Sequence, residues 1–176
     1  MIIEDIIQIG NPLLTKKALR VKDFSSPKIK QTITNLIDTM RASNLIWIAA
    51  PQIGVSVRIF VTELRSTPLR KQQDKDPLRI FINPKIVWKS KKTCIMYEWC
   101  GSVAYSKFFG PVKRPMSIII EEIDEHGDKV QLRASWLLAR VIQHEYDHLD
   151  GNIFIEKITD MKQCMSSEEY RKRINF

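Results

Sequence analysis

The hydrophobic positions between Ser135 and Gly151 recur at helical spacing on two neighbouring stripes, which begin at Leu137 and Leu138. Serine is a favoured N-cap residue, and glycine commonly ends a helix in the left-handed conformation. Apolar side chains on both stripes predict a helix that is buried on most of its surface. We therefore expect this helix to lie at the centre of the fold.

Two further helices are expected before it. A short one follows Pro12, and a longer one opens at Ser26-Pro27, where serine is the cap and proline occupies the first turn. The apolar face of the longer helix consists of Ile33, Leu36, Ile37 and Met40.

Period-two patterns predict strands at 57–62, 79–82, 85–89 and 153–155, and a hairpin of 115–124 with 129–133. His126 lies in the turn of that hairpin and is expected to be solvated. Residues 65–78 are expected to form a polar loop, and the tail to be helical from Ser166 or Ser167. These elements predict one α+β domain, residues 1–176, with antiparallel sheets packed around the buried helix.

Composition and charge limit the class of protein. The chain has 176 residues with 44% hydrophobic and 27% charged side chains, as in a globular domain. Its start is acidic, unlike a signal peptide, and no apolar run approaches the length of a membrane span, so we expect a cytoplasmic protein. The net charge of +8 favours a polyanionic neighbour such as a ribosome surface, or simply gives a basic surface. No motif for sequence-specific nucleic-acid binding is present.

The central helix contains H-E-x-x-H, formed by His144, Glu145 and His148. Residues four apart on a helix share a face, so both imidazoles can bind one ion while Glu145 moves protons. The alternative is a core helix whose histidines only satisfy hydrogen bonds. Two histidines leave a catalytic ion one protein ligand short, because such sites use three and keep one position open.

Two other segments contain polar residues in an unusual setting. Gln52 is the polar residue of the otherwise apolar stretch 45–54, and it needs a backbone or ligand partner if buried. The second segment is Glu98-Trp99-Cys100-Gly101-Ser102. Three cysteines in the chain do not suggest a disulfide framework.

Together the three segments resemble motifs of the peptide deformylases. That family has a glutamine motif near G-x-G-L-A-A-x-Q, a cysteine motif E-G-C-x-S and a helix motif Q-H-E-x-D-H-L-x-G. This chain has LIWIAAPQ, EWCGS and QHEYDHLDG in the same order and at similar separations. The resemblance extends from Ile7 to about Ile158, and the helix motif is complete.

The resemblance implies removal of the N-formyl group from nascent chains that begin with formylmethionine. Cys100 would join His144 and His148 as the third ligand of one divalent ion, with Fe²⁺ favoured in the cell and Zn²⁺, Ni²⁺ or Co²⁺ as substitutes. A Cys94–Cys100 disulfide is the alternative role for that thiol. Glu145 would transfer the proton.

The resemblance also assigns supporting residues. The Gln52 amide and the Gly101 N–H would stabilise the oxyanion. Glu98 would orient a ligand histidine, and Asp147 is a candidate to fix a histidine tautomer.

The chain departs from the family where Leu45, Trp47, Trp99 and Trp136 replace glycines. Indoles at 47 and 99 would narrow or block the cleft, so one alternative is a deformylase-like binding protein without turnover. Another is a different H-E-x-x-H metallopeptidase, and a structural zinc site is the least favoured. Three tryptophans at glycine positions also suggest UGA recoding, because some bacterial codes assign UGA to glycine and others to tryptophan.

Overall fold

The computed structural model describes residues 3–67, 75–124 and 127–174. Its helices are α1 (Pro27–Ala42), α2 (Trp136–Leu149) and α3 (Ser167–Ile174). The strands are β1 (Trp47–Ala49), β2 (Ile59–Leu64), β3 (Asp76–Lys89), β4 (Thr93–Glu98), β5 (Phe108–Pro115), β6 (Ser117–Ile123), β7 (Lys129–Ser135) and β8 (Met165–Ser166). Short 3₁₀ turns occur at Pro12–Thr15, Ala50–Ile53, Ala104–Ser106, Phe154–Lys157 and Met161–Gln163.

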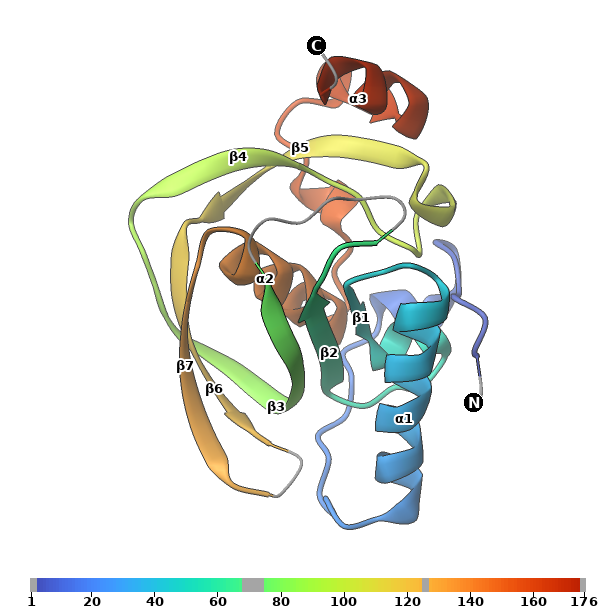
Figure 1. Cartoon of the computed structure of the whole chain (residues 1–176), viewed down its shortest axis with the longest axis vertical. Helices are drawn as coiled ribbons and strands as arrows, with labels where there is room; N and C mark the ends of the chain where they lie inside the picture. Colours follow the sequence, from blue (N-terminus) through green and yellow to red (C-terminus); the bar gives the residue numbers. More distant parts are fainter. Residues whose placement is uncertain (1–2, 68–74, 125–126, 175–176) are drawn as a thin grey trace.

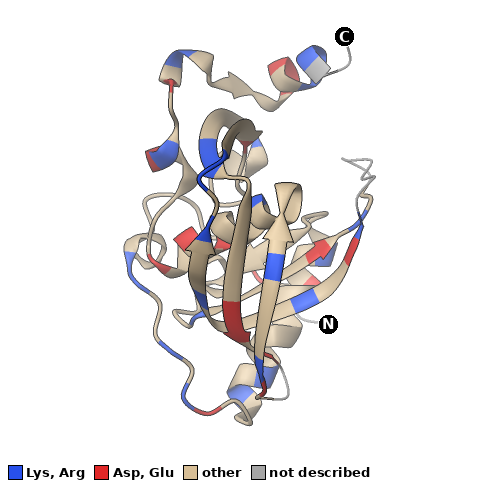
Figure 2. Cartoon of the chain, turned by 90° about the vertical axis from the view of Figure 1, so that its left-hand side faces the viewer, with Lys and Arg blue, Asp and Glu red and all other residues tan. Residues whose placement is uncertain are grey.

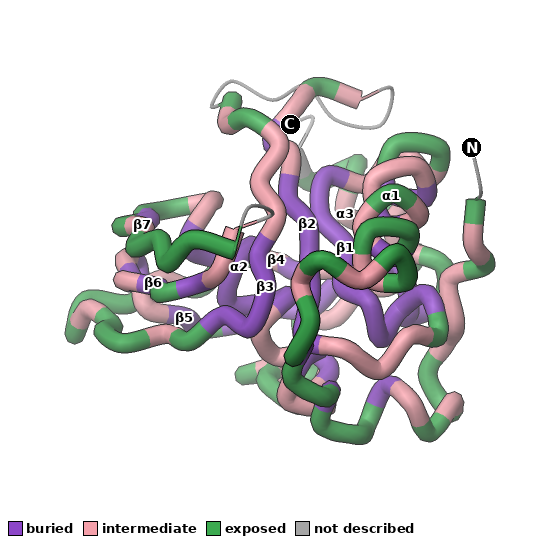
Figure 3. Tube along the Cα trace, turned by 90° about the horizontal axis from the view of Figure 1, so that it is seen from below, coloured by how far each residue is buried: buried purple, intermediate pink, exposed green. Residues whose placement is uncertain are grey.

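The strands form two antiparallel sheets, in the orders β1-β2-β3-β6-β7 and β4-β5-β8. Figure 1 shows α2 enclosed by the curved sheets, α1 beside β1 and β2, and α3 at the far end against β4 and β5. Buried segments gather along the central strands and α2 (Figure 3). The expected α+β class, with antiparallel sheets around a buried helix, is confirmed.

The centre of the core is where the larger sheet packs against α2. Phe60 of β2 and Phe81 of β3 stack with ring centroids 4.4 Å apart, and both rings are fully buried. Ala139, Ile142 and Leu149 of α2 belong to the same cluster. A well-packed core fixes the helix in position, and therefore also fixes the two histidines that project from another face of the helix. None of the helices in the described residues is both long and apolar enough to span a bilayer.

Both predicted ends of α2 lie at the expected residues, with Ser135 at the N-cap position. Gly151 has φ of 77°, the left-handed conformation expected after the helix. The Ser135 side chain does not cap the helix, since its hydroxyl lies 2.9 Å from that of Ser117 across the β6–β7 pair. Ser26 likewise makes no side-chain cap at α1. The first residue of α2, Trp136, has φ of 54°.

The prediction of two strands at 79–82 and 85–89 is wrong, because β3 is one strand from Asp76 to Lys89. Asn83 has φ of 49°, and its side chain donates to the Val21 carbonyl at 2.8 Å and accepts from the Val21 N–H at 2.9 Å. The register with β6 shifts between Ile82 and Lys85. The strand therefore bends at a bulge and continues.

The strand predicted at 153–155 is also wrong, since the 3₁₀ turn Phe154–Lys157 occupies that place. β4 and β5 were not among the predicted strands. The hairpin is confirmed as β6 and β7, and the helical tail as α3. His126, which was expected to be solvated, lies outside the described residues.

Candidate metal centre

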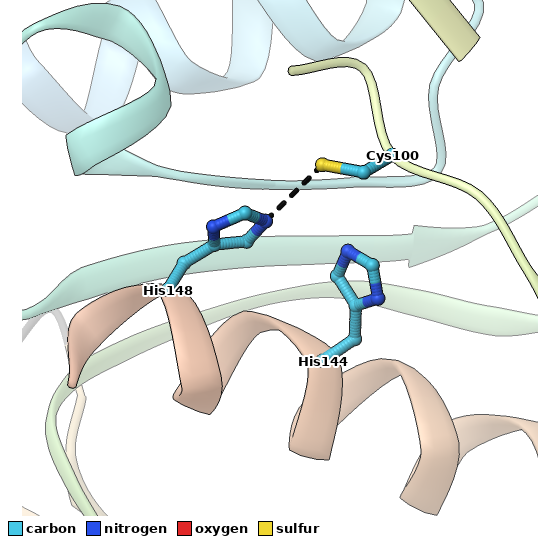
Figure 4. Close-up of side chains that lie close together, drawn as sticks. All are labelled: Cys100, His144 and His148. Carbon is cyan, nitrogen blue, oxygen red and sulfur yellow. Dashed lines mark hydrogen bonds between the residues drawn. The ribbon is translucent and has the colours of Figure 1, made fainter. Parts of the chain in front are cut away.

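Two segments distant in sequence bring the predicted ligands together. His144 and His148 project from one face of α2, and Cys100 lies just beyond the end of β4 (Figure 4). The N-terminal arm (residues 3–26, before α1) holds the cysteine loop (residues 99–102, after β4) in place. Gln8 Nε2 donates to the Gly101 carbonyl at 2.9 Å, and the Ile9 N–H donates to the Ser102 carbonyl at 2.9 Å.

The three side chains have the composition and spacing of a metal site. Cys100 Sγ lies 3.2 Å from His148 Nε2, and the ligand atoms of Cys100, His144 and His148 all lie within 4.8 Å of one another. Metal bonds of about 2.0–2.3 Å from a common centre nearly span such a gap. His144 Nε2 is buried and has no hydrogen-bond partner among the described residues. An unpartnered nitrogen facing a thiol and a second imidazole fits a missing cation.

Burial sets the protonation of two of these groups. Burial, followed by the neighbouring Glu145 carboxyl, raises the pKa of the Cys100 thiol far above its usual value. Burial, followed by His144, lowers the pKa of His148 well below its usual value, so this imidazole is neutral. Neutral imidazole is the form that binds metal, whereas the thiol must lose its proton, so metal binding should release a proton.

A buried carboxylate orients the first histidine. Glu98 Oε2 lies 3.0 Å from His144 Nδ1, as expected from its assigned role. Burial alone would raise the pKa of Glu98, but hydrogen bonds from Arg114 and His144 outweigh it and hold this pKa far below its usual value. An ionised Glu98 accepts a hydrogen bond from the His144 Nδ1–H, which leaves the Nε2 lone pair of His144 for an ion.

The expectation that Asp147 fixes a histidine tautomer is wrong. Its carboxylate accepts from Arg114 Nη1 at 2.7 Å and pairs with Lys157 Nζ at 3.4 Å. Asp147 lies three residues from His144, and its side chain is directed to the Arg114 guanidinium rather than to a ring. Asp147 therefore helps to hold the Arg114 guanidinium in place, and Arg114 in turn donates to Glu98.

Glu145 is fully buried beside the cluster, and neither carboxyl oxygen has a hydrogen-bond partner among the described residues. Its Oε1 lies 3.9 Å from His144 Nε2. Burial raises the pKa of Glu145 well above its usual value. A buried carboxyl group with a raised pKa and no hydrogen-bond partner is a candidate to accept and donate a proton in the reaction.

Gln52 has the backbone partner expected from its buried position and also faces the cysteine. Its Oε1 accepts from the Ala49 N–H at 2.8 Å, which turns the amide nitrogen toward Cys100 Sγ and Ser102 Oγ, both at 3.3 Å. The Gly101 N–H has no acceptor in the part of the chain that the structure describes. The Gln52 amide nitrogen thus faces Cys100, and the Gly101 N–H is the next backbone donor along the chain.

A cavity of about 240 Å³ adjoins His144 and contains both Trp47 and Trp99 in its wall. The indole centroids lie 5.3 Å apart and the planes are tilted by 52°. The two indoles therefore line this space and leave part of it open. A larger hollow of about 690 Å³ lies against Tyr146 and Asp150 on another face of α2, and none of the three metal-ligand candidates lines it.

Three supporting residues were not found from the sequence. Gln8 tethers the cysteine loop, while Arg114 and Arg140 both bind Glu98, with Arg140 Nη1 at 2.5 Å from Oε1. An arginine on an otherwise apolar stretch of α2 is a signal that could have pointed to Arg140, because buried charges need partners. The structure does not contain the alternative disulfide, since Cys94, Cys100 and Cys164 are free.

Comparisons with known proteins agree with this geometry. The family model described as polypeptide deformylase matches residues 3–164. The chain is similar to peptide deformylase 2 of Nostoc sp., with 35% identity covering 96% of this chain and 93% of that one. It is also similar to the peptide deformylase of Pseudothermotoga lettingae, with 38% identity covering 92% of this chain and 86% of that one.

Solved structures give the same result. The peptide deformylase of Thermotoga maritima superimposes with a TM-score of 0.80 at 30% identity, and the match covers 91% of this chain and 100% of that one. The Met-Ala-Ser-bound class I type b peptide deformylase of Acinetobacter baumannii superimposes with a TM-score of 0.82 at 27% identity, covering 89% and 99% of the two chains.

Proposed function

We propose how this chain's own residues perform the reaction of the polypeptide deformylase family, to which the chain belongs. Members of that family are metal-dependent amidohydrolases that remove the N-formyl group from nascent proteins. Cys100, His144 and His148 hold the metal ion, Glu145 transfers the proton, and Gln52 with the Gly101 N–H stabilises the oxyanion.

The donor set supports one divalent ion. A thiolate and two imidazoles bind Fe²⁺, Zn²⁺, Ni²⁺ or Co²⁺, and we propose Fe²⁺ as the ion in the cell, in keeping with the family resemblance. When bound, such an ion supplies Lewis acidity that lowers the pKa of water. Glu98 keeps His144 oriented for this role through the Nδ1 hydrogen bond of 3.0 Å.

Glu145 is the proton carrier. Its buried carboxyl lies beside His144 without another hydrogen-bond partner among the described residues, so it is available to water and substrate. It takes a proton from the attacking water and returns it to the amine that leaves the formyl carbon. The products are formate and a peptide with a free N-terminus.

The developing oxyanion needs donors that are in place before the reaction. The Gln52 amide is fixed by its bond to the Ala49 N–H, so its nitrogen points at the cysteine loop before substrate arrives. The Gly101 N–H lies on the same loop. The cavity beside His144, bounded by Trp47, Trp99 and Leu137, is a suitable place for the side chain of the first residue.

We further propose one deformylase domain, residues 1–176, that works in the cytoplasm near the ribosome. The net charge of +8 supports contact with a polyanion. In the view of Figure 2, the basic residues of the described segments are spread over strands, the N-terminal arm and the C-terminal helix. This distribution suits general electrostatic attraction better than recognition of a base sequence.

The observation that carries the proposal is the cluster of Cys100, His144 and His148 with the buried Glu145 carboxyl beside it. The test uses the iron-loaded protein with a formyl-Met peptide and, in parallel, the same peptide without the formyl group. We expect formate and a new amine from the first peptide and no cleavage of the second. Cleavage of a peptide bond in either substrate would instead indicate the metallopeptidase alternative, and tight binding without formate release would indicate the binding-protein alternative.

A further inference from the structure

Aromatic rings form a continuous path from the candidate metal centre to the C-terminal helix. Trp47 lies 6.1 Å from the His144 ring and 5.3 Å from Trp99, measured between centroids. Trp99 stacks on Phe109 at 5.2 Å, and Phe109 stacks on Tyr170 at 4.4 Å. The path therefore ends on α3, a helix outside both sheets (Figure 1).

Tyr170 is the residue of α3 that meets this path and also lines the cavity beside His144. It packs on Tyr97 of β4 with centroids 5.6 Å apart. Its neighbours Glu169 and Arg171 are exposed, whereas Tyr170 itself is half-buried on the side of the helix that faces the protein.

The position of α3 is fixed by backbone bonds as well as by the ring. β8 pairs with the start of β5, with Phe109 opposite Met165, and the Ser167 N–H donates to the Lys107 carbonyl at 2.9 Å. The phenol of Tyr170 is therefore held at the cavity rather than hanging free in solvent.

We propose that Tyr170 is a specificity-determining residue, which makes α3 the outer wall of the pocket for the substrate's first side chain. This inference rests on the proposed function. The same cavity is lined by His144 of the candidate metal centre and by Tyr170 of α3. A side chain that occupies this cavity beside the metal ligands is therefore within reach of the tyrosine ring.

The chemistry of this wall favours a slender, polarisable side chain. Aromatic rings attract thioether sulfur at their edges, and an unbranched chain fills irregular gaps. Methionine has both properties, norleucine has the shape without the sulfur, and phenylalanine has a rigid ring that adapts less well to a cavity of about 240 Å³ lined by two indoles. Tyr170 is thus placed to contact a methionine side chain and to disfavour a rigid, wider one.

The test measures binding and does not depend on turnover. In metal-loaded Glu145→Gln protein, calorimetry compares formyl-Met-Ala-Ser, formyl-norleucyl-Ala-Ser and formyl-Phe-Ala-Ser. We expect methionine to bind best. Tyr170→Ala should reduce the methionine-over-phenylalanine preference about tenfold, in the range that one pocket group typically contributes. Tyr170→Phe should keep the preference, and Arg171→Ala, on the exposed side of the same turn, should leave all three affinities unchanged.

Tyr170→Leu repeats the measurement if the alanine variant does not fold. Equal weakening of all three peptides in the Tyr170 variants would overturn the inference and leave the proposed function intact, because the parent protein still binds formyl peptides. If Glu145→Gln itself binds none of them, the proposed function fails and the inference fails with it.

Discussion

At the scale of single residues, the Cys100 thiol is buried and its pKa is raised, so it will not ionise without a cation beside it. We predict that Cys100→Ala loses most of its metal, as measured by elemental analysis of dialysed protein. Cys94→Ala and Cys164→Ala are matched controls, since both remove a free thiol outside the ligand cluster, and both should keep the metal. Full metal occupancy in Cys100→Ala would contradict the ligand assignment.

The Glu145 carboxyl separates metal binding from proton transfer. We predict that Glu145→Gln keeps the metal and loses roughly 10²–10⁴-fold of the deformylase rate, the usual contribution of general acid–base catalysis. Formate release at saturating substrate and metal content are measured on the same sample. Glu121→Gln, at an exposed position of β6, is the control and should match the parent protein. Undiminished activity in Glu145→Gln would rule out this mechanism.

Roles that depend on spacing within one helix could be predicted from the sequence, whereas roles that depend on contacts between distant residues could not. His144 and His148 follow from spacing along one helix, and the resemblance added Cys100. Glu98 and Asp147 are both carboxylates close to a ligand histidine in the sequence or the fold, and Arg114 of β5 donates to both of them, but only Glu98 also contacts His144. The sequence pattern contains no information about these contacts, because the two arginine bonds join residues far apart in the chain.

At the scale of elements, the start of α2 has a conformational conflict. Trp136 has φ of 54°, in the left-handed region that disfavours residues with a Cβ, and its side chain is 63% exposed. Left-handed backbone costs an L-residue about 1–2 kcal/mol, and an exposed indole recovers little of that through burial. The position therefore has the conformation for which glycine is suited.

We predict that Trp136→Gly raises the free energy of unfolding by about 1 kcal/mol, measured by urea denaturation. Trp88→Gly is the comparison, because Trp88 lies in β3 outside the left-handed residues, and glycine in a strand interior is unfavourable. The two variants should shift stability in opposite directions. Destabilisation by both would show that the Trp136 indole makes a net favourable contribution.

Elements with a strong local pattern were predicted well, and those defined by partners were not. α1, α2 and the β6–β7 hairpin follow from periodicity and turn residues. β3 was divided at Asn83-Pro84 because proline and a turn residue normally end a strand, whereas the Asn83 side chain pairs with the Val21 backbone and lets the strand continue. β4 and β5 depend on pairing with each other, from Thr93 opposite Pro115 to Glu98 opposite Gly110.

At the scale of the whole molecule, Leu45 and Trp136, which both replace family glycines, differ in how they fit the structure around them. A Cβ on Gly101 would lie 3.3 Å from Leu45 Cδ1, so leucine at 45 and glycine at 101 fit each other. Leu45 replaces a family glycine, and its side chain packs against an apolar cluster that includes Leu36 and Ile48. Trp136 is different, because its backbone conformation remains that of a glycine.

This contrast bears on the three tryptophans that replace family glycines. The chain has 6 glycines and 4 tryptophans in 176 residues, against a usual glycine share of about 7%. Trp47 is buried within β1, and Trp47 and Trp99 both stand in the wall of the cavity beside His144. UGA codons assigned to glycine would explain all three positions at once, and adaptation would explain them as a reshaped pocket.

The double variant Trp47→Gly with Trp99→Gly distinguishes these explanations. An indole inserted into a packed site designed for glycine costs on the order of 1–3 kcal/mol, unless the neighbours have changed to fit it. We predict that the double variant has higher deformylase activity than the parent, because the cleft beside His144 widens. Activity on a formyl-Met peptide and the urea midpoint are measured together. A variant that is less stable and no more active would identify the indoles as native packing, and UGG codons at 47, 99 and 136 would exclude recoding independently.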